Sequence, residues 1–384
     1  MSEFKLAAGQ SLLVASRGVF ELHGLTRWVQ ADGKWRGKTL ARVNQLSSLT
    51  RHPTLPVIYG TSRVGMEGDI HAWRVEGDTA ITLGEKSSEG AEPCHLVVDP
   101  SGRLLIVTNY TTSMLGLQRL AADGSFEGPI EQLKLSGGGP ELERQDDAHP
   151  HQAFFIGETL VVIDLGADLV REFSLDLSKP GTDALTQLRA TAVPANTGPR
   201  HAVVLPDGRL AVSGELGSNL VVGRLGDPAS SWANVRATQQ TGPGKTRWSR
   251  NYPGDIQRAL DGRHVYFANR SLDTISTFDV SGATPTLVAE RDSQTQWPQH
   301  LLVTESHVLV AGWDSGAVKA LPLANGVPTG VEPCSTARAR AGCCSGTELA
   351  ISCAPVRPHG GGPTGAVLVD IVAETSERGE HGSS

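Results

Sequence analysis

Residues 97–120, VVDPSGRLLIVTNYTTSMLGLQRL, contain three short apolar stretches separated by two turns. The first turn is the PSG of residues 100–102, and this combination of proline and glycine favours a tight reversal of the chain. On either side the apolar residues alternate with polar ones or run for a few positions only, which is the spacing and length of β-strands. The segment is therefore predicted to fold as strand, turn, strand, turn, strand.

The same pattern recurs along the chain at a regular distance. The strongest copies are residues 202–225 and 255–280, with PDG and LDG turns, and the weaker copies are residues 154–176, 301–323 and 47–75. The residues that end the middle strands are separated by 47, 55, 50, 55 and 43 positions, and they are Ser62, Asn109, Asp164, Gly214, Asn269 and Gly312. A period of about fifty residues with several strands per unit is typical of the blades of a β-propeller.

This period predicts an all-β fold, a seven-bladed β-propeller with four-stranded antiparallel blades around a central channel. The six copies account for six blades. Residues 11–35 are expected to supply part of the seventh blade, and the C-terminus is expected to supply its missing strand. No stretch between the strands has a helical period of sufficient length, which argues against an α/β fold. One closed ring implies a single domain, predicted over residues 1–325.

The chain after residue 325 loses the strand and turn pattern, and residues 326–384 are expected to form a divergent, partly disordered tail. Whether a closing strand remains there is left open. Four of the five cysteines lie in this tail, and no CxxC pair or zinc-like Cys/His spacing occurs anywhere in the chain. We therefore expect no metal site and no cofactor.

Composition excludes two classes of partner. The formal net charge is −7, whereas proteins that bind nucleic acid usually carry a basic face. No apolar stretch is long enough to cross a membrane, and the N-terminus lacks the basic and apolar segments of a signal peptide. The sequence therefore predicts a cytoplasmic protein without a nucleic-acid or membrane partner, and it leaves the oligomeric state open.

Polar residues gather where the first strand of each blade begins. In a propeller this strand lines the central channel. The stretch DDAHPHQAFF, residues 146–155, places two histidines at the start of one such strand, and TGPRHAVV, residues 197–204, places an arginine and a histidine one blade later. Five consecutive blades bring polar or ionisable residues to the same rim, namely His95, His149, His151, Arg200, His201, Asn251, Asp255, Gln299 and His300.

These segments resemble the lactonase family of seven-bladed propellers, which includes one type of bacterial 6-phosphogluconolactonase and the fungal carboxy-muconate lactonizing enzyme. The resemblance extends from about residue 10 to 325 and is carried by PCHLVVDPSGRLLIVTNY, DDAHPHQA, DLGADLVREFSLD, GPRHAVVLPDGRLAVSGELGSNL and DGRHVYFANRSLDTISTF. It implies the propeller fold and an enzyme that acts on a small-molecule lactone.

The resemblance also implies a set of site residues. His149 or His151 and Glu215 are expected to be catalytic, and the expected substrate-binding residues are Arg200, Arg270, His201 and Asp255. Two positions depart from the family pattern. SGEL stands where an asparagine usually precedes the glutamate, and Asp255 stands where glutamate is common, so the role of Asp255 is left open. His201 is expected mainly to support Arg200, while Asn109 and Asp164 are interpreted as residues that stabilise turns.

Opening a lactone requires a base that activates water and donors that stabilise the developing oxyanion. A histidine suits the first role, and arginines suit the second or can bind a substrate phosphate or carboxylate. Sugar-lactone hydrolysis, with 6-phosphogluconolactone as the leading substrate, is the first hypothesis. The alternatives are a muconate-type cycloisomerase, which forms the lactone, and a non-catalytic propeller that binds a protein or metabolite.

Overall fold

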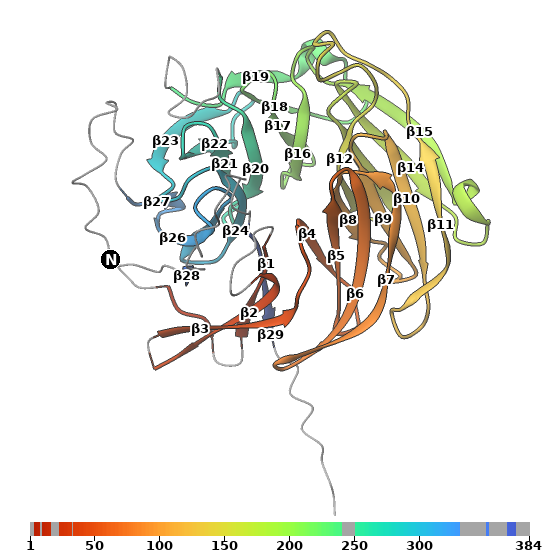
Figure 1. Cartoon of the computed structure of the whole chain (residues 1–384). Coiled ribbons are helices and arrows are strands. Elements are labelled where there is room, and N and C mark those ends of the chain that lie inside the picture. The colour runs from red at the N-terminus through yellow and green to blue at the C-terminus, as the bar shows by residue number, and fades with distance from the viewer. Residues whose placement is uncertain are drawn as a thin grey trace, which may run out of the picture.

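The computed structural model describes residues 4–7, 10–16, 23–32, 34–239 and 250–330, together with the backbone of residues 351–352 and 367–373. Seven antiparallel sheets follow one another around a common centre, as Figure 1 shows. The all-β, seven-bladed propeller predicted from the period is therefore confirmed. Within the described residues the only helices are two short 3₁₀ turns, η1 (Gly181–Ala184) and η2 (Ala229–Ser231), and neither is long and apolar enough to cross a membrane.

The blades are numbered in chain order, and the strands of each blade are named from the centre outward. Blade 1 holds β29 (Val367–Ala373), β1 (Gln10–Ser16), β2 (Gly24–Ala31) and β3 (Lys34–Ala41), and blade 2 holds β4 (Ser48–Arg51), β5 (Val57–Val64), β6 (Glu67–Glu76) and β7 (Thr79–Ala91). Blade 3 holds β8 (Pro93–Val98), β9 (Leu104–Asn109), β10 (Met114–Leu120) and β11 (Phe126–Lys134), and blade 4 holds β12 (Pro150–Ile156), β13 (Thr159–Asp164), β14 (Leu169–Leu175) and β15 (Leu185–Ala192).

The remaining blades follow the same order. Blade 5 holds β16 (Pro199–Val204), β17 (Leu210–Gly214), β18 (Asn219–Gly223) and β19 (Ala233–Arg236), and blade 6 holds β20 (Pro253–Arg258), β21 (His264–Asn269), β22 (Thr274–Asp279) and β23 (Thr286–Asp292). Blade 7 holds β24 (Pro298–Val303), β25 (His307–Gly312), β26 (Ala317–Ala324) and β27 (Val327–Pro328), and the short β28 (Ile351–Ser352) also pairs with β26.

The repeat seen in the sequence corresponds to the turn and strand register of the structure. In five blades the second strand ends at the aligned residue, at Asn109, Asp164, Gly214, Asn269 and Gly312. The glycines of the three sequence turns, Gly102, Gly208 and Gly262, have φ angles of 75°, 81° and 69°. Only glycine adopts this left-handed region without steric cost, which is why the same turn requires the same residue three times.

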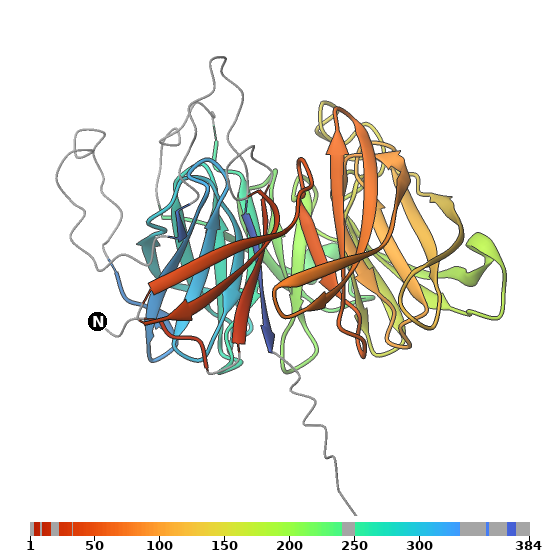
Figure 2. The same cartoon turned by 60° about the horizontal axis from the view of Figure 1, so that its bottom comes forward.

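The C-terminal strand closes the ring. Strand β29 pairs antiparallel with β1 from Gln10↔Ala373 to Ser16↔Val367, and it contacts both β4 and β24. It therefore takes the innermost position of blade 1, the position that β4, β8, β12, β16, β20 and β24 take in the other blades. Figure 2 shows this strand beside the N-terminal strands of blade 1. The expectation that the C-terminus supplies the missing strand agrees with this pairing.

The predicted tail thus contributes backbone to the propeller at residues 351–352 and 367–373. The rest of the tail, including its expected partial disorder and Cys334, Cys343, Cys344 and Cys353, lies outside the residues whose side chains are described.

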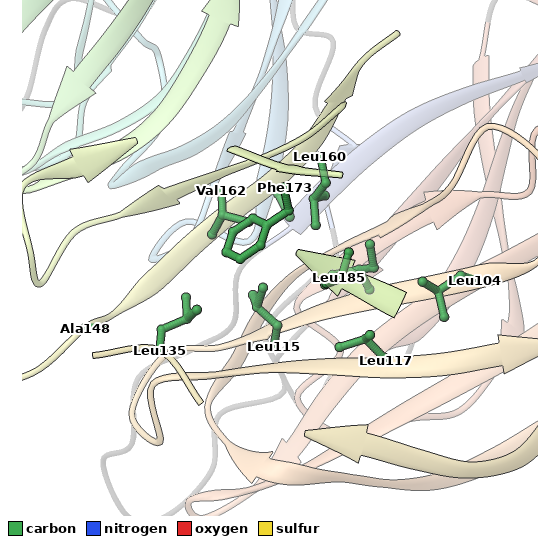
Figure 3. Close-up of a cluster of buried hydrophobic side chains, with 11 residues drawn as sticks. Leu104, Leu115, Leu117, Leu135, Ala148, Leu160, Val162, Phe173 and Leu185 are labelled. Carbon is green, nitrogen blue, oxygen red and sulfur yellow. The ribbon is translucent and has the colours of Figure 1, made fainter. Parts of the chain in front are cut away.

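Apolar side chains between neighbouring blades form the core. Between blades 3 and 4 the cluster in Figure 3 includes Leu104 and Leu115 on one side and Leu160, Val162 and Phe173 on the other, each at most 2% exposed. The second strands of blades 3, 5, 6 and 7 are buried along their whole length because a neighbouring blade covers each face, so their sequences are apolar runs rather than strict alternations. Burying each large side chain contributes about 1.5–3 kcal/mol, and this packing holds the inner strands in place around the centre.

Candidate active site

The inner strands of blades 3 to 7 begin in the same way, with a proline followed by a β-bulge. In each blade this proline pairs with the last residue of the second strand, and the register then shifts; the prolines are Pro93, Pro150, Pro199, Pro253 and Pro298. The residues at the shift are Cys94, His151, Arg200, Gly254 with Asp255, and Gln299. A bulge turns the side chain of its extra residue away from the regular alternation. The same irregularity therefore recurs at the start of five inner strands.

Glu215 is the centre of an ionic cluster at this end of the ring. Its Oε2 accepts a 2.6 Å hydrogen bond from Nη2 of Arg270, and its Oε1 accepts a 2.8 Å hydrogen bond from Nη2 of Arg144. Nε of Arg200 lies 3.1 Å from Oε2. The Arg200 contact is an ion pair without a hydrogen bond, and Nη1 of Arg200 is buried with no partner among the described residues. Three guanidinium groups thus surround one carboxylate, which leaves the cluster with an excess of two positive charges.

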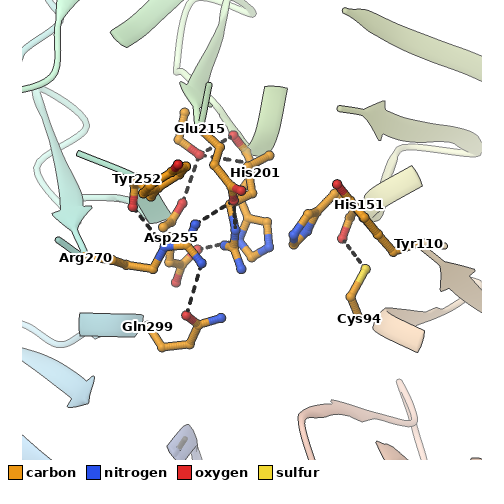
Figure 4. A network of polar contacts seen from close by, with 12 residues as sticks. Cys94, Tyr110, His151, His201, Glu215, Tyr252, Asp255, Arg270 and Gln299 are labelled. Carbon is orange, nitrogen blue, oxygen red and sulfur yellow. Dashed lines mark hydrogen bonds and ion pairs between the residues drawn. The ribbon is translucent and has the colours of Figure 1, made fainter. Parts of the chain in front are cut away.

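The charge state of Glu215 follows from these contacts. Burial acts to raise the pKa of the carboxyl group, but Arg270, Arg144 and Arg200 outweigh burial and lower its pKa to about 2. Glu215 is therefore ionised at neutral pH, and it holds no proton to donate. The carboxylate holds the three guanidinium groups in place around it. Figure 4 shows Glu215 together with Arg270.

The imidazole of His151 lies beside this cluster. Its ring meets the Tyr110 ring edge to face at 5.7 Å and the His201 ring at 5.3 Å. Its Nδ1 is buried and has no hydrogen-bond partner among the described residues. Burial, followed by the positive charges of Arg200, lowers the pKa of His151 well below its usual value. The imidazole is therefore neutral at pH 7.

His149 is arranged differently, although it lies only two positions earlier. Its ring stacks on Tyr110 at 4.4 Å, its Nδ1 lies 2.8 Å from the Tyr110 carbonyl oxygen, and its Nε2 lies 3.1 Å from Oδ1 of Asp146. Its backbone N–H donates to Asp164. Both ring nitrogens of His149 are thus engaged within the protein, whereas Nδ1 of His151 has no partner in the part of the chain that the structure describes.

A second layer of ionisable groups consists of His201, Asp255 and His300, and the His201 ring contacts the His151 ring. Nδ1 of His201 lies 2.8 Å from Oδ1 of Asp255, and Nδ1 of His300 lies 2.9 Å from Oδ2. Burial acts to raise the pKa of Asp255, but His300 and His201 outweigh it and hold the pKa well below its ordinary range. Asp255 also accepts backbone N–H bonds from Ile256 and Leu301. Both of its oxygens are therefore occupied by groups of the protein itself.

Comparison with known proteins assigns the family. Residues 30–326 match the family model described as lactonase, 7-bladed beta-propeller. The chain belongs to this lactonase family. The resemblance read from the sequence is therefore confirmed, and so is the expectation of a lactone-hydrolysing enzyme.

Individual relatives are distant but cover most of the lactonase. The 6-phosphogluconolactonase of Bacillus subtilis is 25% identical over 288 residues, which is 73% of this chain and 80% of that protein. A solved structure of a Lactobacillus plantarum protein superposes with a TM-score of 0.72 at 22% identity and covers 84% of this chain and 97% of that one. The periplasmic gluconolactonase of Pseudomonas aeruginosa gives a TM-score of 0.68 at 20% identity, with coverage of 84% and 97%. At these identities the two structures establish the fold.

The lactonase brings together most of the residues proposed from its sequence. His151, Arg200, Glu215 and Arg270 lie in one cluster, and His201 adjoins it. His149 lies behind Tyr110 and turns both ring nitrogens to other partners. Asp255 lies in the second layer. The functional roles of all these residues stay predictions. Within the described residues, no group of three or more His, Cys, Asp or Glu side chains is arranged to hold a metal ion.

Sequence reasoning missed two members of the cluster, Arg144 and Tyr110. Tyr110 directly follows Asn109 at the end of β9, as Glu215 and Arg270 directly follow the ends of β17 and β21. The register of the repeat therefore contained the signal for Tyr110. Arg144 lies between blades, in a polar connection outside the repeat, and no spacing in the sequence pointed to it.

The buried histidines predict a steep dependence of stability on pH. Burial, chiefly, lowers the pKa of His95 to about 3 and of His201 to about 4, and it holds that of His151 well below 6.5. Unfolded histidines take up protons near pH 6.5, so between pH 6.5 and 4 these three sites together bind up to three more protons in the unfolded chain than in the folded chain. Stability is thus fully present above pH 6.5 and falls with decreasing pH, by up to about 4 kcal/mol per unit.

The measurement is urea unfolding followed by tryptophan fluorescence at pH 7.5, 6 and 5. The unfolding midpoint should decrease at each step. His95→Gln should flatten the decrease because one buried titrating group is gone. An equal midpoint at pH 7.5 and 5 would contradict the assignment of neutral buried histidines.

Proposed function

We propose that this lactonase hydrolyses a sugar lactone and that its substrate is 6-phosphogluconolactone. The observation that carries the proposal is the neutral His151 imidazole, whose buried Nδ1 has no hydrogen-bond partner among the described residues, beside an arginine cluster with excess positive charge. The names of relatives such as the Bacillus subtilis 6-phosphogluconolactonase support the choice of substrate. Cytoplasmic location, predicted from the sequence, stays part of the proposal.

His151 is proposed as the general base. A water molecule loses a proton to the imidazole as its oxygen forms a bond to the lactone carbonyl carbon, and the carbonyl electrons move to the oxygen. The carbon–oxygen bond of the ring then breaks, and the departing alkoxide takes the proton from the imidazolium. The net change is addition of one water to give the hydroxy acid, and the histidine returns to its neutral form.

Arg200 and Arg270 are proposed to stabilise the tetrahedral oxyanion. Both side chains are at most 10% exposed and both contact the same oxygen of Glu215. Fixed positive groups in a site shielded from water stabilise a developing negative charge more than mobile solvent does. Glu215 was expected to be catalytic, but a carboxyl group with a pKa of about 2 is a poor proton carrier at pH 7. We assign it the positioning of the arginines.

The test is continuous titration of acid release from 6-phosphogluconolactone and from glucono-δ-lactone, with spontaneous hydrolysis subtracted. Turnover of the phosphorylated lactone well above background is the expected result. No rate above background from folded protein on either lactone would overturn the proposal. Muconate lactones would then test the cycloisomerase alternative, and binding assays would test the non-catalytic one.

The role of Glu215 yields a separate prediction. In Glu215→Gln the three guanidinium groups lose their counter-charge, and breaking a buried ion pair costs about 3–5 kcal/mol. We expect the Tm to decrease and turnover to fall strongly. A bound phosphate ion can replace the missing negative charge. Inorganic phosphate should therefore raise the Tm of Glu215→Gln more than that of the wild type, with chloride at equal ionic strength as the reference for each protein. Identical phosphate shifts for the two proteins would contradict a positioning role.

A further inference from the structure

Residues 136–147, SGGGPELERQDD, connect β11 of blade 3 to β12 of blade 4 and reach across to blades 5 and 6. This connection is well anchored. Gln145 donates from Nε2 to the Leu165 carbonyl at 2.9 Å, and its Oε1 accepts the backbone N–H of Glu141. The Glu141 carboxylate forms two hydrogen bonds with the Arg250 guanidinium, which comes from the segment before β20. The connection is thus tied to the protein at both sides of Arg144.

Arg144 lies on the solvent side of the ionic cluster. Its side chain is 34% exposed, compared with 5% for Arg200 and 10% for Arg270. Arg200 and Arg270 both contact Oε2 of Glu215, whereas Arg144 contacts Oε1. The three guanidinium groups therefore divide into an inner pair and one outer group on the opposite oxygen of the carboxylate.

The outer guanidinium has donors to spare. Within the described part of the chain, both of its hydrogen bonds leave from Nη2, one to Glu215 and one to the Tyr110 hydroxyl oxygen at 3.1 Å. The Nε and Nη1 groups remain for a ligand. Burial raises the pKa of Tyr110, so its hydroxyl keeps its proton while it accepts the bond from Arg144. The Arg144 guanidinium and the Tyr110 hydroxyl are thus two neighbouring donors. The Tyr110 ring contacts the His151 ring, so it fixes the position of its hydroxyl relative to the proposed base.

The charge of the cluster exceeds what lactone opening alone requires. One oxyanion carries one negative charge, which the inner arginine pair can stabilise while Glu215 offsets part of their charge. Although burial acts to lower the pKa of Arg144, Glu215 and Tyr110 hold this third cation and raise its pKa, and the cluster keeps an excess of positive charge that a neutral lactone does not offset. A substrate with an anionic group remote from the reacting carbonyl would offset it.

We propose that Arg144 is the specificity-determining residue of this site and that it binds, together with the Tyr110 hydroxyl, a phosphate or carboxylate remote from the lactone carbonyl. This inference rests on the proposed lactone hydrolysis and narrows its substrate class to anionic lactones. In 6-phosphogluconolactone the phosphate is attached to the exocyclic carbon, which is bonded to the ring carbon that carries the ring oxygen, on the side where the ring opens. The inner arginines then act on the carbonyl and the outer arginine acts on the phosphate.

The test compares wild type, Arg144→Gln and Arg144→Lys on 6-phosphogluconolactone and on uncharged glucono-δ-lactone. For Arg144→Gln we expect kcat/KM on the phosphorylated lactone to fall about 10- to 100-fold, the factor that loss of a hydrogen bond to a charged group gives. Most of the loss should be in KM because the contact is made equally in the ground state and the transition state. The loss on the phosphorylated lactone should be clearly larger than the loss on the uncharged lactone, and Arg144→Lys should recover part of it.

Arg224→Gln is the matched control, since Arg224 is an exposed arginine on blade 5 that donates to the Asp207 carbonyl away from the site. Inhibition by inorganic phosphate gives a readout independent of turnover of the phosphorylated substrate, and Arg144→Gln should weaken it. Equal losses on both lactones, or none, would overturn the role of Arg144. Absence of wild-type turnover on both lactones would instead overturn the proposed function, so the two failures are distinguishable.

Discussion

Replacing His151 with glutamine is expected to lower kcat for lactone hydrolysis by about 100- to 10,000-fold, the contribution typical of a general base. Glutamine retains hydrogen-bonding capacity and similar length but cannot take the proton of the attacking water. KM should change little because no proposed binding contact to the substrate is removed. The measurement is steady-state acid release at pH 7, with far-ultraviolet circular dichroism to establish that the variant is folded.

His149→Gln is the control variant for His151→Gln. His149 bonds to the Tyr110 carbonyl and to Asp146 and stacks on Tyr110, so its loss should lower stability and disturb Tyr110 but leave a base in place. Its effect on kcat should be at least tenfold smaller than that of His151→Gln. If His149→Gln abolishes turnover while His151→Gln retains it, the assignment of the base is reversed.

Removing the closing strand should have the largest effect on stability. A chain that ends at residue 366 lacks β29, so β1 loses an antiparallel partner along seven residue pairs and the ring of inner strands opens beside β4 and β24. Backbone hydrogen bonds contribute about 1 kcal/mol each, and a strand pairing of this length contributes several of them. The loss is comparable with the total of about 5–15 kcal/mol that stabilises a typical domain.

We therefore expect the truncated chain to unfold at a much lower urea concentration, to aggregate through the exposed edge of β1, and to lose activity. The matched control ends at residue 373, which keeps all of β29. Urea unfolding and analytical size exclusion of the two chains make the comparison. Equal unfolding midpoints would mean that β29 does not stabilise the ring in solution.

The blade period and the turns could be predicted because they depend on local chemistry. A PSG, PDG or LDG turn between apolar strands identifies itself by residue type, and glycine is required by the positive φ at Gly102, Gly208 and Gly262. Strand ends at Asn109 and Asn269 followed from the same register. Position in the repeat also placed His151 and Arg200 on one rim, since equivalent positions of a closed ring meet at the same end of its axis, whereas Glu215 and Arg270 were proposed from the family resemblance.

The distinction between His149 and His151 did not follow from their sequence positions. Both precede the same strand, and an even spacing of two predicts the same face for both. The β-bulge between Pro150 and Gln152 breaks that alternation. It turns His151 toward His201 while His149 stacks behind Tyr110. Which of two similar side chains keeps a free nitrogen depends on partners from other blades, and these are brought together only by the fold.

The sequence by itself determined the number of blades, their strand order and the rim on which the ionisable residues gather, because turn chemistry and apolar spacing act between near neighbours. Only the tertiary structure decided the electrostatics of the site. Glu215 lies 71 positions from Arg144 and 55 from Arg270, and Asp255 lies 54 from His201. The charge state of each group is set by burial and by partners at such separations. Closure of the ring buries these groups and brings their partners together, and neither effect can be predicted from the residues next to them in the sequence.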